Sequence, residues 1–320
     1  MNMALNPTKL ANQVRQDMNQ VALEAAQHLL DEHPNFNVLR RLGHRTQFAE
    51  PDGKSLLRGV VIDTETTGLS HERDVIIELG MVLFDYDPIT GQVYQVLKTF
   101  DQLEQPPFPI PPESMAVHGI TDEMVAGMKI DDAKVAEFLE GVSFVIAHNS
   151  KFDRKFLENR LSIFEGLPWG CSLDQIGWIK EGLGSAKLDY IAFKFGFFFD
   201  GHRAEEDCLA LLEILQQPLP KSGELALKTL LNQSAQRSYK INATAAPFDA
   251  KDKLKARGYR WDGEKRVWHT TVAGDEAIIA EIAWLKPEIY SGKDAKLEFE
   301  VLDAMTLFSA RPGKQIFKAI

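Results

Sequence analysis

Residues 59–68 read Gly-Val-Val-Ile-Asp-Thr-Glu-Thr-Thr-Gly, a short apolar run that ends in two closely spaced acids. The β-branched residues of this run favour a buried strand. Side chains alternate along a strand, so Asp63 and Glu65 are expected on one face, about 6–7 Å apart. Two carboxylates at the end of an apolar strand are costly unless a cation lies between them. The alternative is a solvated strand end that leads into a turn.

The pattern on both sides of this run predicts an α/β fold. Further strands are expected over residues 75–84, 92–100 and 142–147, and helices from about residue 150 and over 187–195 and 204–215. The turn residues Asp85–Gly91 join the second strand to the third and favour an antiparallel start. Strands that then alternate with helices predict a mixed sheet, antiparallel and then parallel, flanked by helices.

Composition divides the 320 residues into about two domains with flanking segments. The predicted parts are a helical N-terminal segment (1–57), the α/β domain (58–218), a linker that includes one helix (219–246), a small basic and aromatic module (247–287) and a tail (288–320). An amphipathic stripe that includes Val14, Met18 and Val21 predicts the N-terminal helix. Residues 58–218 hold 13 basic and 27 acidic side chains, whereas residues 219–274 hold 11 and 5, so an acidic block precedes a basic one.

Several classes of protein are excluded by simple counts. Only Cys171 and Cys208 are present, which excludes a disulfide framework and a cysteine-rich zinc site. No apolar run approaches the roughly 18 residues that cross a bilayer, and residues 1–30 lack the apolar core of a secretory signal. We therefore expect a cytoplasmic protein with no membrane partner. There is no P-loop and no G-x-S-x-G elbow.

Two more acidic clusters follow predicted strands. Residues 148–153 read His-Asn-Ser-Lys-Phe-Asp, which places Asp153 in the first turn of a helix; an ordinary helix cap is the alternative. Residues 202–207 read His-Arg-Ala-Glu-Glu-Asp. On one helix, His202 and Asp207 would point about 140° apart, so they converge only if His202 precedes the helix. Gly201 favours this position, and a surface histidine is the alternative.

The three motifs in this order resemble the DnaQ-like, or DEDDh, 3′–5′ exonuclease family over residues 58–217. The family pattern is D-x-E, N-x-x-(F/Y)-D and H-x-x-x-x-D, and every required residue is present. The segments Val117–Thr121 and Lys187–Asp189 are similar to the family's HGIT segment and KLD helix start. The resemblance implies a ribonuclease H-like sheet and hydrolysis of phosphodiester bonds from a 3′ end.

The resemblance also implies roles for individual residues. Two divalent cations, Mg²⁺ or Mn²⁺, would be held by Asp63, Glu65, Asp153 and Asp207, because such cations prefer oxygen ligands and can activate water beside a phosphate. His202 would be the general base. The residues expected to receive the terminal nucleotide are Thr66, Thr67, Gly68, His118, Asn149 and Phe152. His148, Glu205 and Glu206 are interpreted as structural or surface residues.

The basic module is similar to the small C-terminal module of exodeoxyribonuclease X-like proteins, with its F-D-x-K-D and G-Y-R-W features at residues 248–252 and 258–261. Basic side chains interleaved with aromatic ones suit contact with DNA. The predicted DNA contacts are Lys251, Lys253, Lys255, Arg257 and Arg260. Trp261 and Trp268 are expected to pack in the core of the module.

The tail contains an apolar pentapeptide, Ala304–Phe308, in a segment expected to be solvated. It resembles the bacterial sliding-clamp motif Q-L-(S/D)-L-F, with Met305, Leu307 and Phe308 as anchors and with Ala304 in place of Gln. This predicts a sliding clamp as a partner. The alternative is that Leu307 and Phe308 fold back onto the basic module.

Taken together, the sequence predicts a metal-dependent exonuclease that acts on DNA 3′ ends in repair or proofreading. One alternative is an exoribonuclease that trims RNA 3′ ends, because the same fold does both. The other is a non-catalytic subunit that binds or tethers ends. The complete set of four acids and His202 counts against this last alternative.

Overall fold

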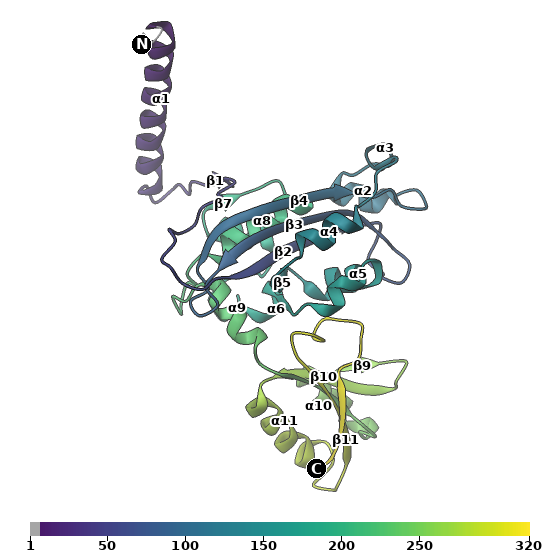
Figure 1. Ribbon diagram of the computed structural model, residues 1–320. Coiled ribbons are helices and arrows are strands. Elements are labelled where there is room, and N and C mark those ends of the chain that lie inside the picture. The colour runs from purple at the N-terminus through teal and green to yellow at the C-terminus, as the bar shows by residue number, and fades with distance from the viewer. Residues whose placement is uncertain (1–6) are drawn as a thin grey trace.

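The computed structural model describes residues 7–320, with side chains from residue 18 onward. Helix α1 (Pro7–Asp31) projects away from the rest of the molecule (Figure 1). Of its predicted apolar stripe, Met18 and Val21 are exposed, whereas the side chain of Val14 lies outside the described residues. After α1 the chain joins the main body through β1 (Arg40–Arg41), which pairs in parallel with β7 (Phe197–Phe198).

The predicted α/β fold is confirmed by a five-stranded mixed sheet in the order β4-β3-β2-β5-β6. Its strands are β2 (Leu57–Thr66), β3 (Ile76–Tyr86), β4 (Val93–Leu103), β5 (Val142–Ala147) and β6 (Trp169–Cys171). The pairs β2–β3 and β3–β4 are antiparallel, and the pairs β2–β5 and β5–β6 are parallel. The central strand β2 therefore ends beside the start of the helix that follows β5.

Helices cover both faces of this sheet. They are α2 (Pro112–His118), α3 (Asp122–Val125), α4 (Asp132–Phe138), α5 (Ser150–Arg160), η1 (Ser162–Gly166), α6 (Ser172–Gln175), α7 (Leu188–Lys194), α8 (Ala204–Leu215) and α9 (Ala226–Ser234). The alternation of β2 explains the two cores: Val61 packs with α8 and α9 on one face, whereas Val60 and Ile62 pack with α4 and α5 on the other. Residues 40–234 are called here the N-terminal body.

A second five-stranded sheet, in the order β12-β11-β8-β10-β9, forms the C-terminal body (residues 238–320). Its elements are β8 (Ser238–Ala243), η2 (Phe248–Ala250), α10 (Lys251–Ala256), β9 (Arg260–Asp262), β10 (Val267–Ala273), α11 (Asp275–Glu288), β11 (Lys296–Leu302) and β12 (Lys314–Ala319). Its core includes Ile241, Leu254 and Phe299. Among residues 7–320, none of the helices is both long enough and apolar enough to cross a bilayer.

Two predicted segments are corrected by this sheet. Besides the one helix expected there (α9), the predicted linker contains the central strand β8, and the predicted tail contains β11 and β12. These strands are short and find their partners far away in the chain, as Ile241 does opposite Phe299. The prediction that Trp261 lies in the core is also wrong: its side chain is 51% exposed, because β9 is an edge strand, whereas Trp268 packs partly against the core.

The loop between β11 and β12 returns to the N-terminal body (yellow in Figure 1). Ala304 accepts hydrogen bonds from the backbone N–H of Trp169 (2.8 Å) and from Arg154 Nη1 (3.0 Å). Arg154 also donates to the carbonyl oxygens of Met305 and Leu307. The pentapeptide that resembles a clamp motif is thus folded, and Phe308 is only 8% exposed. The pentapeptide folds back onto the protein, as the alternative to clamp binding predicted. Its backbone, however, contacts α5 and β6 and not the basic module.

Candidate active site

The D-x-E pair of β2 meets the acid of α8 at one end of the first sheet. Asp63, Glu65 and Asp207 each offer a carboxylate oxygen within 4.8 Å of the others. Asp63 and Glu65 lie on the same side of β2, as the alternation of the strand predicts. Helix α8 crosses β2 and β3, which brings Asp207, in its first turn, to the end of the strand.

Asp153 joins this group from the first turn of α5. Its Oδ1 accepts hydrogen bonds from the backbone N–H of Thr64 (3.1 Å) and from Thr64 Oγ1 (2.9 Å), and the carboxylate is buried. Asn149, just before α5, adopts a left-handed backbone with φ of 99°, which allows the sharp turn from β5 into the helix. The turn and the hydrogen bonds place Asp153 beside the end of β2.

His202 lies in the loop before α8, as Gly201 indicated. Its backbone is left-handed, with φ of 68°. Asp207 Oδ2 accepts hydrogen bonds from the N–H groups of His202 (2.8 Å) and Arg203 (3.1 Å), so the carboxylate also holds the loop. The imidazole is exposed and lines the same cavity as the acids.

The resulting cavity, called here the acidic cavity, has a volume of about 180 Å³. Its lining residues are Asp63, Thr64, Glu65, His148, Asn149, Phe152, Asp153, His202 and Asp207. All five residues predicted to be catalytic are therefore brought together. Of the predicted nucleotide-binding residues, Asn149 and Phe152 line the cavity, whereas Thr66, Thr67, Gly68 and His118 do not.

Burial and mutual repulsion raise the pKa values of the acids. Burial is the largest cause in each case, and it raises the pKa of Glu65 to about 8, of Asp153 to about 7 and of Asp207 to about 6. The pKa of Asp63 is well above its ordinary value, because burial is joined by the charges of Asp153 and Asp207. Four oxygen donors that repel one another in a small cavity are a ligand set that fits hard divalent cations.

An ion pair between a buried acid and an exposed arginine helps to hold α8 in place. Glu78 on β3 lies opposite Glu65 in the sheet and is fully buried. It accepts hydrogen bonds from Arg203 Nε (2.9 Å) and from the backbone N–H of Ala204 (3.1 Å). A lone acid within the apolar run Ile76–Phe84 was a signal of a special role, but its partner has no sequence signature.

The loop after β2 is tied to α2. Ser114 Oγ donates to the carbonyl oxygen of Thr67 (2.8 Å), and Thr67 Oγ1 accepts from the backbone N–H of Val75 (3.0 Å). His118 is buried, and its Nδ1 accepts from the N–H of Ile120 (3.0 Å). Its Nε2 has no hydrogen-bond partner among the residues that the structure describes, and burial lowers its pKa. A buried imidazole with one unbonded nitrogen therefore lies near this loop.

His148 lines the acidic cavity, but both of its ring nitrogens are engaged. Nδ1 lies 2.8 Å from Ser172 Oγ, and Nε2 lies 2.9 Å from the carbonyl oxygen of Ala186. Burial lowers the pKa of His148 to about 4, so the ring is neutral at pH 7. These contacts fit the structural role expected for it, and Glu206 is paired with His44 at the surface (2.9 Å).

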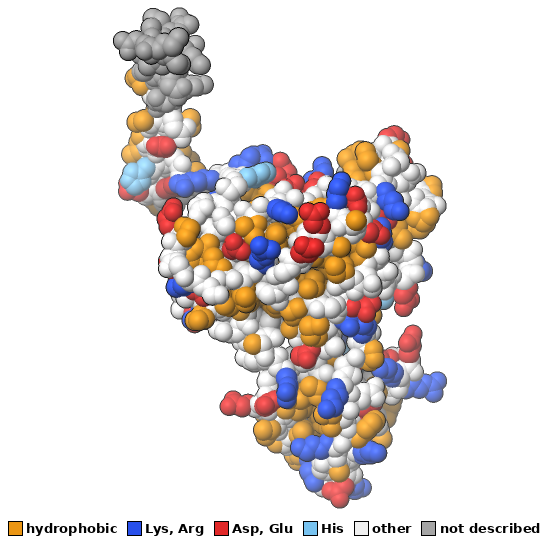
Figure 2. Space-filling model, viewed as in Figure 1, with side chains coloured by type: hydrophobic (Ala, Val, Ile, Leu, Met, Phe, Trp, Pro, Cys, Tyr) orange, Lys and Arg blue, Asp and Glu red, His pale blue; other side chains and the backbone are white. Residues whose placement is uncertain are grey.

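The predicted DNA-contacting residues lie on α10, on β9 and between them, away from the acidic cavity. On the face seen in Figure 2, Lys and Arg side chains are scattered over the C-terminal body. Lys253 is paired with Glu288 (2.9 Å), and Arg257 is paired with Glu281 (3.0 Å), both acids being on α11. Contact with DNA through these residues therefore stays a prediction, with part of their charge already neutralised.

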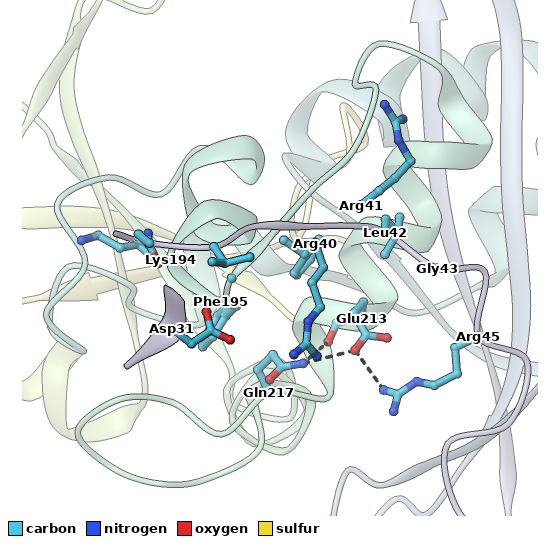
Figure 3. A pocket seen from close by; sticks show the side chains of 14 residues that line it. Asp31, Arg40, Arg41, Leu42, Gly43, Arg45, Lys194, Phe195, Glu213 and Gln217 are labelled. Carbon is cyan, nitrogen blue, oxygen red and sulfur yellow. Dashed lines mark hydrogen bonds and ion pairs between the residues drawn. The ribbon is translucent and has the colours of Figure 1, made fainter. Parts of the chain in front are cut away.

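A larger cavity of about 710 Å³ lies where the N-terminal segment meets α7 and α8 (Figure 3). Three of its charged lining residues are in ion pairs: Arg45 contacts Glu213 (3.0 Å), and Arg41 contacts Asp200 (2.7 Å). It shares no lining residue with the acidic cavity. We therefore assign the chemistry to the smaller cavity.

Known proteins resemble the part of the chain that forms this cavity. A family model described as exonuclease (RNase T) matches residues 60–215. The chain is 32% identical over 161 residues to the DNA polymerase III subunit epsilon of Treponema pallidum, which covers 48% of this chain and 72% of that protein. The corresponding protein of Aquifex aeolicus is 32% identical over 162 residues, covering 48% and 77%.

Two further matches differ in extent. The DNA polymerase III PolC-type protein of Thermotoga maritima is 32% identical over 161 residues, but this match spans only 11% of that protein. A solved structure described as exonuclease X in complex with 5′ overhanging duplex DNA is 26% identical, covers 54% of this chain and 97% of that one, and has a TM-score of 0.39.

Proposed function

Because this chain belongs to the DnaQ-like (DEDDh) family and is a 3′–5′ exonuclease, we propose that it removes nucleotides from DNA 3′ ends in repair or proofreading. The observation that carries the proposal is the acidic cavity, where carboxylates from β2, α5 and α8 converge beside His202. The names of the epsilon relatives support DNA as the substrate. The alternatives are RNA 3′ ends and a non-catalytic role in binding ends.

Two divalent cations, Mg²⁺ or Mn²⁺, fit the cavity. Asp63, Glu65 and Asp207 would hold one, and Asp63 with Asp153 would hold the second. When bound, such cations activate water and neutralise the charge that builds up on a phosphate during hydrolysis. The four carboxylates share the cavity, where Thr64 orients Asp153 and the His202–Arg203 backbone orients Asp207.

His202 is proposed to accept the proton of the attacking water. The water oxygen forms a bond to the terminal phosphorus, and the bond from phosphorus to the O3′ of the preceding nucleotide breaks. The O3′ keeps the electron pair and takes a proton from solvent, so the products are a nucleoside 5′-monophosphate and a strand with a 3′-hydroxyl. The left-handed backbone of His202 and its hydrogen bond to Asp207 direct the exposed imidazole toward the cavity. An imidazole side chain can both accept and release a proton, which suits this role.

The terminal nucleotide is proposed to lie at the mouth of the acidic cavity. A volume of about 180 Å³ accommodates the scissile phosphate more readily than a whole nucleotide. Asn149 and Phe152 would contact the nucleotide from α5, and the backbone of Thr66–Gly68 with His118 would contact it from the opposite side. The Nε2 of His118 is buried, so it could bind a polar group of the sugar only if the side chain became accessible.

The test uses purified protein, Mg²⁺ and 3′-labelled single-stranded DNA, duplex DNA and RNA of one sequence. We expect release of labelled mononucleotide from DNA, loss of release in Asp63→Ala and Asp207→Ala, and a decrease of roughly 10²–10⁴ in turnover for His202→Ala. Glu205→Ala, on the same helix as Asp207 but outside the cavity, is the matched control and should stay active. Cleavage of RNA alone, or full activity in Asp63→Ala, would contradict the proposal.

Binding to a bacterial sliding clamp stays an untested prediction. The motif would have to detach from α5 first, because Arg154 binds the backbone of Ala304, Met305 and Leu307, and Phe308 is buried. Release of a buried, hydrogen-bonded segment opposes binding. We therefore base no part of the proposed function on it.

A further inference from the structure

A groove of about 700 Å³ runs between the two bodies of the molecule, and it is called here the interdomain groove. One wall comes from α5 and from the region of α6, the other from β8 and β10, and the loop after β11 lies in it. We propose that this groove binds the sugar–phosphate backbone of the single strand whose 3′ end lies in the acidic cavity. The proposal deepens the proposed function and rests on it.

The charge of the groove favours a polyanion. Four lysines line it, Lys151 and Lys155 from α5, Lys180 after α6 and Lys240 from β8. The acid among the lining residues, Asp174, is paired with Lys151 (2.7 Å). Among residues 18–320, the other three lysines have no ion-pair partner within 4.0 Å, so their charge is available to an anionic ligand.

The positive charge of the groove also affects His269, which lines the groove from β10. Burial lowers the pKa of His269, and the positive charges of Lys240 and Arg260 lower it further. The N-terminal body as a whole is strongly acidic, with 13 basic and 27 acidic residues over 58–218. Lysines from the edge of this acidic body and from the basic segment 219–274 meet in the groove, and a local positive surface attracts phosphates.

The groove and the acidic cavity share no lining residue, but they adjoin along α5. Asn149 lines the cavity, and Lys151, two residues later, lines the groove. Asp153 and Lys155 point to opposite sides of the same helix, whose diameter is about 10 Å. A strand that crosses the N-terminal end of α5 would thus pass from one site to the other, and this helix end favours phosphate.

The walls of the groove are joined by buried interactions. Arg154, fully buried on α5, donates to three carbonyl oxygens of the loop 304–307, and it is paired with Glu158 (2.7 Å). Glu158 is also paired with Arg311 from the same loop (3.0 Å). These bonds hold the C-terminal body against α5, so the groove has fixed walls. Its volume is in the range of small-molecule pockets, which suits a few nucleotides of one strand.

The test compares the full chain with a variant that carries Lys155→Ala, Lys180→Ala and Lys240→Ala. Binding of a labelled 20-nucleotide single strand is measured by fluorescence anisotropy at several salt concentrations, without divalent cations. We expect weaker binding and a slope of log K against log salt that falls by about 2, since each lost phosphate contact contributes about 0.7. A charge-matched control with Lys265→Ala, Lys293→Ala and Lys318→Ala, all outside the groove, should keep the slope of the unmodified protein.

A second readout separates the groove from the cavity. The p-nitrophenyl ester of thymidine 5′-monophosphate is small enough to use the cavity alone, so its hydrolysis with Mg²⁺ should be equal in the groove variant and the unmodified protein. Unchanged affinity and slope in the groove variant, or equal competition by polyglutamate of the same charge, would overturn the proposal. If the unmodified protein cleaves neither the ester nor DNA, the proposed function fails, whereas the salt slopes still test the groove.

Discussion

At the scale of single residues, the carboxylates of the acidic cavity lower the stability of the metal-free protein but form a binding site. Glu65, Asp153 and Asp207 come from three separate elements, and burial raises the pKa of each above its ordinary value near 4. Placing such groups together is unfavourable for the metal-free protein and favourable for a protein that binds cations. The same carboxylates should therefore govern how stability depends on pH.

This cost can be measured as a pH dependence. The folded protein binds protons at these groups more tightly than the unfolded chain does. The stability that these protonated groups contribute is therefore complete below about pH 4 and is lost as the pH rises through about 6 to 8. Thermal unfolding in EDTA is followed by circular dichroism at pH values from 4.5 to 8.5. Over this range the midpoint should decrease more steeply in the unmodified protein than in the double variant Asp63→Asn with Asp207→Asn. Mg²⁺ should raise the midpoint at pH 8. Equal slopes in both proteins would contradict this.

At the scale of elements, α5 has three roles because a helix presents a different side every one or two residues. Asp153 points into the acidic cavity, and Lys151 and Lys155 line the interdomain groove. Arg154 and Glu158, four residues apart, share a third side and bind the loop after β11. The position of a catalytic acid is in this way coupled to the docking of the C-terminal body.

Removal of Arg154 tests this coupling. In Arg154→Ala, Glu158 loses its buried partner and three carbonyl oxygens each lose one donor, the carbonyl oxygen of Leu307 included. We therefore expect the free energy of unfolding to fall by about 3–5 kcal/mol. Lys151, on the same helix, forms a solvent-exposed ion pair with Asp174 of α6. Lys151→Ala should therefore lower the free energy of unfolding by at most about 1 kcal/mol. Urea unfolding followed by circular dichroism gives both values. Similar losses in the two variants would show that the buried cluster contributes no more than a surface pair.

At the scale of the whole molecule, the two bodies meet after α9 and not at the start of the predicted linker. Leu219, Leu227 and Leu230 are buried in the core of the N-terminal body. Helix α9 therefore belongs to that body, and the chain leaves it between Ser234 and Ser238. A cut at residue 218 would remove part of the core, whereas a cut after residue 236 would not.

Two truncated chains distinguish these boundaries. The chain 1–236 should unfold cooperatively and hydrolyse the p-nitrophenyl ester, but it should bind long single strands more weakly and with a smaller salt slope. The chain 1–218 should be much less stable, because the loss of three buried leucines exposes apolar surface. Thermal denaturation and binding assays check both. Equal stability of the two chains would contradict the boundary drawn here.

The sequence by itself determined the parts that depend on local spacing. The alternation of β2 placed Asp63 and Glu65 on one side, and Gly201 placed His202 before α8. The tertiary structure alone decided the contacts between distant residues: Arg203 meets Glu78 across 125 positions, and Arg154 meets Ala304 across 150. Likewise, the register of the short strands β8, β11 and β12 is fixed only by their pairing with one another. Local periodicity reflects which side of an element is buried, but it carries no information about which distant surface covers it.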